Sequence, residues 1–289
     1  MSVPTPAAHG SADLIESAKR AACHRAVHEN FVPGTFKYVG IGSGSTVAYV
    51  VEAIAAYGPS VTSSLKFVPT GSGSTNLIKN AGLTVLQVPD LLAEVGWAGP
   101  GSPRQAIDIY FDGADEVDEE LNVIKGGGAC LFQEKLVSRL SKKFICVADS
   151  RKKAPRLLSN WKYVPIEVSP AAAELVRRAL IDLGSKDPAV RVWGPTYTTL
   201  VTDNGNHIID APFPTMLLNS ESDKMDPEKG IWTPDALTVK IRDILGVLEV
   251  GIFSGLTGPQ ASAMGVNVQG VRPVKIYFGA ADGGVETLE

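Results

Sequence analysis

Short apolar runs alternate with helix-like stretches over the first 160 residues, and this alternation restricts the fold more than any other feature. An apolar run without polar alternation is typical of a strand buried on both faces of a sheet, and strands that alternate with helices indicate parallel pairing. We therefore predict a doubly wound, mostly parallel α/β sheet, Rossmann-like in its layering. The expected strands are 38–41, 66–69, 84–88, 107–111 and 144–148, and the expected helices are 11–29, 46–57, 75–80 and 131–140.

The start of the first helix carries Asp13 and Glu16, which could form a capping box, and residues 1–11 before it are expected to be disordered. After residue 161 the pattern changes to that of a smaller α+β domain. Its expected strands are 164–168, 198–202, 208–211 and 248–253, and its expected helices are 172–183 and 237–244.

The predicted division is an α/β catalytic domain, residues 12–163 plus 265–289, and a smaller domain, 164–264, that acts as a lid or in oligomerisation. The run 274–278 is expected to return as a strand to the first sheet. Two segments, 90–105 and 218–232, are expected to be exposed insertions.

The composition argues against several classes of protein. The 289 residues are 44% apolar and carry a net charge of −4, so the basic surplus that a nucleic-acid-binding face needs is missing. No apolar stretch approaches the roughly 18–20 residues of a membrane span. The three cysteines form neither a disulfide framework nor a zinc motif, and no charged-then-apolar leader begins the sequence. We expect a cytoplasmic protein that contacts neither membrane nor nucleic acid.

Two Gly/Ser loops follow the first two expected strands. The first contains Ser43, Gly44, Ser45 and Thr46, immediately before a helix. Glycines let the backbone approach a ligand, and N–H groups at a helix start attract anions. A plain strand-to-helix turn explains this loop equally well. The second loop, 69–75, would face the same crevice at the carboxyl ends of the strands, or it is a flexible turn.

The fourth strand ends in an acidic cluster that includes Asp112 and Asp115. Clustered carboxylates bind metals or perform acid–base chemistry, and a solvated acidic turn is the alternative. Because the four histidines lie elsewhere and no EF-hand spacing is present, we expect no metal here.

Next comes Lys125 followed by Gly126, Gly127 and Gly128, and then a helix with Glu134 in its first turn. Three successive glycines are entropically costly, which indicates a place where side chains would obstruct something. Glu134 could face the same crevice, or it could simply cap the helix.

These motifs together resemble the type A ribose-5-phosphate isomerases. The resemblance rests on DGADEVD (112–118), KGGGA (125–129) and LxxEK (131–135), and it extends in order over nearly the whole chain from about residue 15. Further matching segments are VGIGSGST (39–46), FICVAD (144–149), VPIEV (164–168), VTDNGNHIID (201–210) and GVLEVGIF (246–253). The resemblance implies an enzyme without cofactor or metal that interconverts ribose 5-phosphate and ribulose 5-phosphate through an enediolate, in the non-oxidative branch of the pentose phosphate pathway. A homodimer or homotetramer is usual for the family.

The resemblance also assigns roles to residues. It implies that Glu134 moves the proton between C1 and C2, that Asp112 and Asp115 assist proton movement at the sugar oxygens and ring opening, and that Lys125 stabilises the enediolate. The implied substrate-binding residues are Ser43, Gly44, Ser45, Thr46, Gly126, Gly127, Gly128, Lys152 and Lys19, with Arg20 as an alternative to Lys19. Segment 71–75 departs from the family, whose members more often carry a bulkier stretch there.

Physical reasoning agrees with this assignment, because aldose–ketose isomerisation needs a poised base and a cation at the developing oxyanion. The runner-up is a non-catalytic sugar-phosphate sensor, which would have no need of the carboxylates and Lys125 together. A related acyl-group or amino-sugar enzyme is a further alternative. A metal held by His24 and His28, or a nucleophilic Cys130, is less favoured than surface histidines and a packing cysteine.

Overall fold

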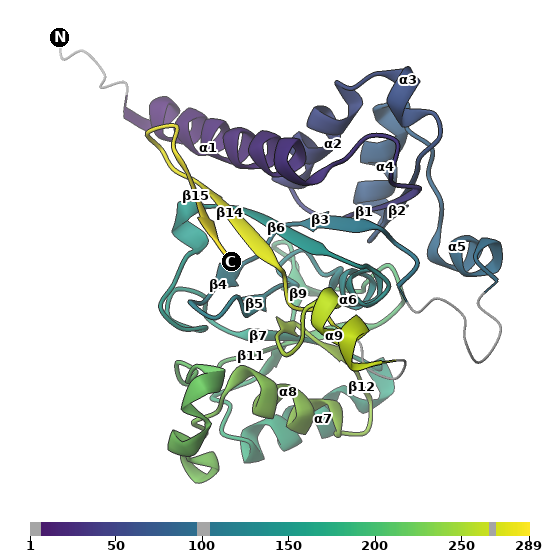
Figure 1. Cartoon of the computed structure of the whole chain (residues 1–289). Helices are drawn as coiled ribbons and strands as arrows, with labels where there is room; N and C mark the ends of the chain where they lie inside the picture. Colours follow the sequence, from purple (N-terminus) through teal and green to yellow (C-terminus); the bar gives the residue numbers. More distant parts are fainter. Residues whose placement is uncertain (1–6, 97–104, 266–269) are drawn as a thin grey trace.

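A six-stranded sheet forms the centre of the computed structural model, which describes residues 7–96, 105–265 and 270–289 (Figure 1). Its strand order is β15-β14-β6-β3-β1-β2, and every pair is parallel except β15 with β14. The predicted doubly wound, mostly parallel sheet is therefore confirmed. Its strands are β1 (Tyr38–Ile41), β2 (Lys66–Pro69), β3 (Ile109–Asp112), β6 (Phe144–Asp149), β14 (Lys275–Gly279) and β15 (Val285–Leu288).

Helices cover the two faces of this sheet, and the side chains of β1 show why its sequence is apolar throughout. Val39 and Ile41 pack in the core under the N-terminal helices, whereas Tyr38 belongs to the core of the opposite face. A strand buried on both faces cannot alternate with polar residues. The first face carries α1 (Ala7–Asn30), α2 (Val47–Ala55), α3 (Pro59–Thr62) and α4 (Ser72–Asn80), and the second carries α6 (Leu131–Arg139).

The second half of the chain contributes a four-stranded antiparallel sheet with the order β12-β7-β11-β8. Two helices cover it, and Ile166, Leu180 and Leu237 are buried in its separate core. The elements are β7 (Val164–Val168), α7 (Ala173–Asp182), β8 (Ala189–Val190), β11 (His207–Ala211), α8 (Pro234–Arg242) and β12 (Val247–Val250). Figure 1 shows this layer on the far side of α6 from the N-terminal helices.

A third, three-stranded sheet lies between the two and was not predicted. It consists of β4 (Glu116–Val117), β5 (Val123–Ile124) and β13 (Ile252–Phe253). The single strand expected at 248–253 is divided at Gly251, because β12 pairs with β7 while β13 pairs with β5. The N–H of Gly251 donates to Pro165 O at 2.7 Å, and its carbonyl accepts from Lys125 N at 2.8 Å. A Cβ at Gly251 would lie 2.3 Å from Lys125 O, so only glycine fits this crossing.

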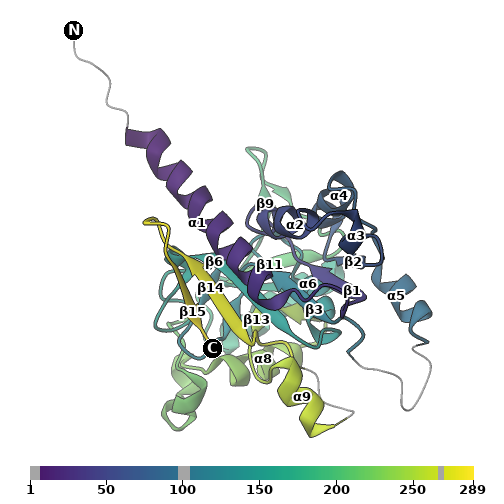
Figure 2. The same ribbon diagram turned by 45° about the horizontal axis from the view of Figure 1, so that its top comes forward.

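An exposed hairpin, β9 (Val192–Trp193) with β10 (Thr198–Thr199), replaces most of the strand expected at 198–202. Figure 2 shows it projecting from the body of the molecule. The polar turn that follows, 203–206, is closed by an antiparallel bridge between Val201 and His207.

Several other expectations were also wrong in detail. Helix α1 already begins at Ala7, so Asp13 and Glu16 lie inside it and Glu16 instead accepts from Lys19 and Tyr49. The expected strand at 84–88 is reduced to one bridge, Phe67 to Val85, because the next helix starts at once. That helix, α5 (Val88–Glu94), occupies the start of the expected insertion 90–105, whose residues 97–104 lie outside the described part.

The segment 218–232 is not wholly exposed either. It forms two short 3-10 turns, Asn219–Lys224 and Pro227–Lys229, and ends in the buried Trp232, whose indole N–H donates to Leu183 O at 2.9 Å. The indole thus anchors the segment to the end of α7. The expected return of 274–278 to the first sheet is confirmed by β14, and α9 (Gly258–Met264) precedes it.

Candidate active site

The candidate site lies at the carboxyl ends of β1, β3 and β6, where parallel sheets ordinarily bind ligands. In the strand order the chain goes from β1 to β2 on one side and from β3 to β6 on the other, so it leaves the neighbouring strands β1 and β3 in opposite directions and a crevice opens between their ends. A cavity of about 270 Å³ occupies this place. Its lining is Lys19, Ser43, Gly44, Ser45, Thr46, Gly113, Ala114, Asp115, Lys125, Gly126, Gly128, Glu134, Asp149, Arg151 and Lys152.

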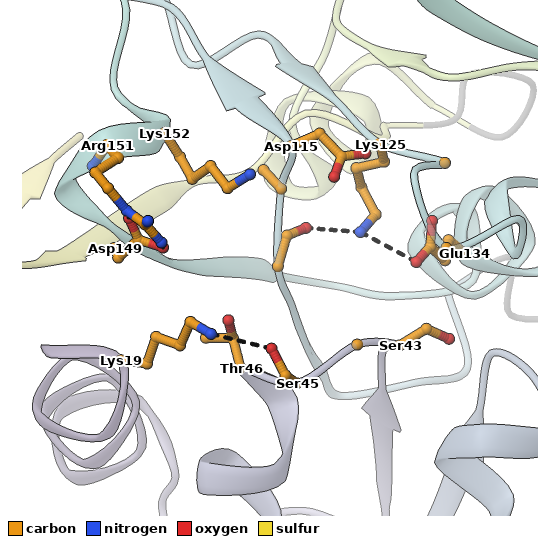
Figure 3. Close-up of a pocket in the computed structure, with 15 residues that line it drawn as sticks. Lys19, Ser43, Ser45, Thr46, Asp115, Lys125, Glu134, Asp149, Arg151 and Lys152 are labelled. Atoms are coloured by element: carbon orange, nitrogen blue, oxygen red, sulfur yellow. Dashed lines mark hydrogen bonds and ion pairs between the residues drawn. The ribbon is translucent and has the colours of Figure 1, made fainter. Parts of the chain in front are cut away.

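Lys125 is the centre of a buried charge cluster at one end of the cavity. Its ammonium lies 2.7 Å from Asp112 Oδ2 and 3.3 Å from Glu134 Oε1, and it donates to Gly113 O at 2.6 Å. All three ionisable side chains are buried. Burial lowers the pKa of a lysine, but the two adjacent carboxylates outweigh it and raise the pKa of Lys125. The ammonium therefore stays charged, and Figure 3 shows it beside Glu134.

Asp112 lies behind Lys125 and is not part of the cavity lining among the described residues. Its Oδ1 accepts from Ser43 N at 3.1 Å and from Gly113 N at 2.7 Å, while Oδ2 accepts from the Tyr110 hydroxyl and meets Lys125. Both oxygens are thus occupied by donors. This geometry fits a carboxylate that holds Lys125 better than one that exchanges protons with a ligand.

Glu134 lies in the first turn of α6, as predicted, but it does not cap the helix. Its Oε1 contacts Lys125, and its buried Oε2 has no hydrogen-bond partner among the described residues. Burial raises the pKa of Glu134 to about 8; Lys125 opposes this rise, and the charges of Asp112 and Asp115 add to it. A buried carboxylate with a raised pKa that lines a cavity is suited to accept a proton.

The contacts of the glycine loop, residues 126–128, account for its glycines. Gly127 N donates to Asp115 Oδ2 at 2.7 Å, and a Cβ at Gly127 would lie 2.7 Å from Asp115 Oδ1, so the carboxylate occupies the space of a side chain. Gly126 has a φ of +107°, which favours glycine, and a Cβ there would meet Leu131 and Pro165 within 3 Å. The loop and Asp115 are therefore fitted to each other.

The opposite end of the cavity is cationic. Lys19, Arg151 and Lys152 gather there in Figure 3, well separated from Glu134. Lys19 Nζ donates to Ser45 Oγ at 3.1 Å, and Arg151 Nε lies 2.6 Å from Asp149 Oδ1. Lys19 also pairs with Glu16 at 2.8 Å, so two of the three cations have carboxylate partners. The three cations and the hydroxyls at the start of α2 are the groups of this cavity that suit an anion.

Comparison with known proteins agrees with this geometry. The sequence profile of the family described as ribose 5-phosphate isomerase A (phosphoriboisomerase A) matches residues 66–264. The chain belongs to this family. Ribose-5-phosphate isomerases of Eremothecium gossypii and Schizosaccharomyces pombe are 42% and 43% identical, over 96% and 94% of this chain and 94% and 82% of theirs.

Solved structures of ribose 5-phosphate isomerases share the fold. One, of an enzyme in complex with phospho-erythronic acid, has a TM-score of 0.73 at 28% identity and covers 95% of this chain and 99% of its own. Another, from Methanocaldococcus jannaschii, has a TM-score of 0.70 at 27% identity with the same coverage. The chain is therefore an isomerase-family enzyme over nearly its full length.

Most of the residues that the resemblance to the isomerases assigned to catalysis or substrate binding line this cavity. Asp112 and Gly127 lie behind its wall, and Arg20 pairs with Glu52 rather than lining it, which leaves Lys19 as the N-terminal-helix lysine. The second Gly/Ser loop contacts the first through Thr70 Oγ1, which lies 2.7 Å from Ser43 Oγ. Sequence reasoning gave no role to the lining residues Gly113, Ala114, Asp149 and Arg151.

The missed residues have signals that could have revealed them. Asp149 is the last residue of β6, at the same sheet edge as Asp112, and Arg151 follows two residues later. Neither a metal held by His24 and His28 nor a nucleophilic Cys130 gains support. His24 lies 3.3 Å from Glu52. Burial raises the pKa of the Cys130 thiol to about 11. In the described part of the chain, no group of three His, Cys, Asp or Glu side chains is placed to hold a metal. No helix of the described residues is long and apolar enough to cross a membrane.

Proposed function

We propose that this chain interconverts D-ribose 5-phosphate and D-ribulose 5-phosphate through an enediolate. One observation carries the proposal: a single cavity has a buried Glu134–Lys125 pair at one end and three cations at the other. A phosphate at the cationic end would direct the carbonyl end of a pentose toward Glu134. The names of the relatives and the family match support the same substrate pair.

In this proposal Glu134 is the base. Its carboxylate, which lines the cavity, removes the proton from C2 of the open-chain aldose and returns it to C1. Because burial raises the pKa of Glu134, the ionised carboxylate is a stronger base than an exposed one. The same residue can act in both directions, as an interconversion requires.

Lys125 would stabilise the negative oxygen of the enediolate. It is a fixed cation in a buried place, where charge stabilisation is stronger than in water. We assign Asp115, which lines the cavity, to the transfer of the hydroxyl proton from O2 to O1 in the enediolate and to ring opening. Asp112 instead holds Lys125 in place, since both of its oxygens already accept hydrogen bonds.

Substrate binding is assigned to the remaining lining residues. Lys19, Lys152, Ser45 and Thr46 would hold the phosphate, and the loop at Gly126 and Gly128 would approach the sugar. We also propose that residues 12–163 with 265–289 form the catalytic domain, that 164–264 form a smaller domain that acts as a lid or in oligomerisation, and that the enzyme is a cytoplasmic homodimer or homotetramer.

The test is conversion of ribose 5-phosphate to ribulose 5-phosphate by the purified protein in excess chelator. Conversion that survives the chelator supports the proposal and excludes an essential accessible metal. Sugar-phosphate binding without conversion would instead favour a sensor. The matched control is Glu134→Gln, which should bind the substrate without converting it.

A further inference from the structure

Arg191 is a nearly buried arginine outside the cavity that makes contact with the glycine loop. It lies just before the exposed hairpin, and its side chain is 11% exposed. Asp210 on β11 holds two of its nitrogens: Nε donates to Asp210 Oδ2 at 2.8 Å, and Nη2 donates to Oδ1. Such a two-point pair fixes the plane of the guanidinium group.

The third nitrogen reaches the loop. Arg191 Nη1 donates to Gly126 O at 2.8 Å and to Gly127 O at 3.2 Å. One fixed cation therefore holds two successive peptide carbonyls. Glycines have no side chains that could fix these planes by packing, and their backbone is the most costly to order. The loop closes one turn of its own, from Ala129 N to Gly126 O at 3.0 Å, and Arg191 adds an anchor from outside it.

The N–H groups of the same peptides point the other way, because C=O and N–H are opposed across a planar trans peptide. The carbonyl of Gly126 accepts from Arg191, and the N–H of the same peptide, Gly127 N, donates to Asp115 Oδ2 at 2.7 Å. Asp115 lines the cavity, whereas Arg191 is not among the lining residues described.

The next peptide repeats this arrangement. Its carbonyl, Gly127 O, faces Arg191, so its N–H, on Gly128, points away from Arg191. Gly128 lines the cavity, and no hydrogen bond from its N–H is found within the described residues. A cation on the carbonyl side also polarises each amide and makes its N–H a stronger donor.

We propose that Arg191, clamped by Asp210, is a positioning residue of this site: it orients two glycine peptides so that Gly127 N holds Asp115 and Gly128 N donates to the oxyanion of the reacting sugar. The inference rests on the proposed function. Arg191 touches no substrate, and its effect passes entirely through the loop. It therefore acts on the reacting end of the sugar and not on the phosphate end.

The experiment compares Arg191→Met with wild type and with Arg156→Met. Arg156 is a matched control because it also pairs with a carboxylate, Glu221, at 2.7 Å. The measurements are kcat, KM, the inhibition constants of phospho-erythronic acid and inorganic phosphate, and the melting temperature. Phospho-erythronic acid presents an anionic carboxylate at the reacting end, whereas inorganic phosphate probes only the cationic end.

For Arg191→Met we expect kcat to fall about 10- to 100-fold, the scale of a small misplacement of catalytic groups, with KM within about threefold. Inhibition by phospho-erythronic acid should weaken about tenfold or more, and inhibition by inorganic phosphate should stay within about twofold. Arg156→Met should match wild type in all four kinetic constants. If Arg191→Met melts too early to assay, Arg191→Ala supplemented with methylguanidinium should regain part of the lost kcat.

A kcat for Arg191→Met within about twofold of wild type would overturn the inference, as would equal weakening of both inhibitors or equal loss in Arg156→Met. Failure of methylguanidinium to raise kcat would count against it in the same way. These outcomes are separate from failure of the proposed function, which would show as no conversion by wild type or as normal turnover by Glu134→Gln.

Discussion

Glu134→Gln should inactivate the enzyme and stabilise its fold above neutral pH. The amide keeps the shape of the side chain but cannot accept the C2 proton. We expect turnover to fall about 10³-fold, within the usual range for loss of an acid–base group. The variant should still bind substrate, since the residues at the cationic end are unchanged.

The effect on stability follows from the pKa. Burial raises the pKa of Glu134 from its ordinary 4.5 to about 8. At high pH, folding therefore carries the free-energy cost of burying a negative charge. At about 1.4 kcal/mol for each pKa unit, the upper limit of this penalty is about 5 kcal/mol. Because glutamine also removes one partner of Lys125, we expect the variant to gain about 1–3 kcal/mol.

The sign depends on pH. Well below pH 4.5, the carboxyl is protonated in both the folded and the unfolded chain, so the variant should gain nothing. Between pH 4.5 and about 8 only the folded state keeps the proton, so wild-type stability declines with rising pH and the variant's advantage grows. Over the same interval kcat/KM of wild type should rise, because the ionised base becomes more populated.

The assays are ribulose 5-phosphate formation against pH and urea unfolding at pH 5 and pH 9. Turnover within tenfold of wild type would refute Glu134 as the base. A variant less stable than wild type at pH 9 would refute the electrostatic argument, even if activity were lost.

Three further substitutions test other parts of the site. Lys125→Met should remove measurable turnover and lower the free energy of unfolding by about 3 kcal/mol, because its carboxylate partners stay buried without a cation; urea titration and the isomerase assay check this. Gly127→Ala should lower kcat about tenfold by displacing Asp115, whereas Gly73→Ala, which has open space around its Cβ, should not. Lys152→Ala should raise KM about tenfold with a smaller change in kcat, as measured by initial rates against substrate concentration.

The sequence predicted the central sheet well because its signal is local. Runs such as 38–41 and 144–148 are apolar throughout, which only strands buried on both faces require. The helix with Glu134 could be predicted because its sequence signal is local too. The missing strand at 84–88 shows the limit: the run is apolar enough, but the chain turns into α5 after one bridge to Phe67.

Contacts across the molecule explain the rest of what was missed. Nothing local distinguishes Arg191 from a surface arginine, because its partners Gly126 and Asp210 are 65 and 19 residues away in sequence. Asp112 belongs to a motif that could be recognised, yet its saturation by Tyr110, Ser43 and Lys125 needs coordinates. Sequence therefore located the residues that line the cavity more readily than the contacts that each one makes.

Gly251 couples two layers of this enzyme mechanically. Its N–H donates to the carbonyl of Pro165 in β7, and its carbonyl accepts from the N–H of Lys125. These two hydrogen bonds couple the antiparallel sheet to the charge cluster around Lys125. Any rigid-body tilt of that sheet would move the backbone of Lys125 with it. A single inserted residue here would shift the register of two sheets at once, whereas the projecting hairpin at 192–199 could change length freely. Length variation among related enzymes should therefore be tolerated at the hairpin and excluded at this crossing.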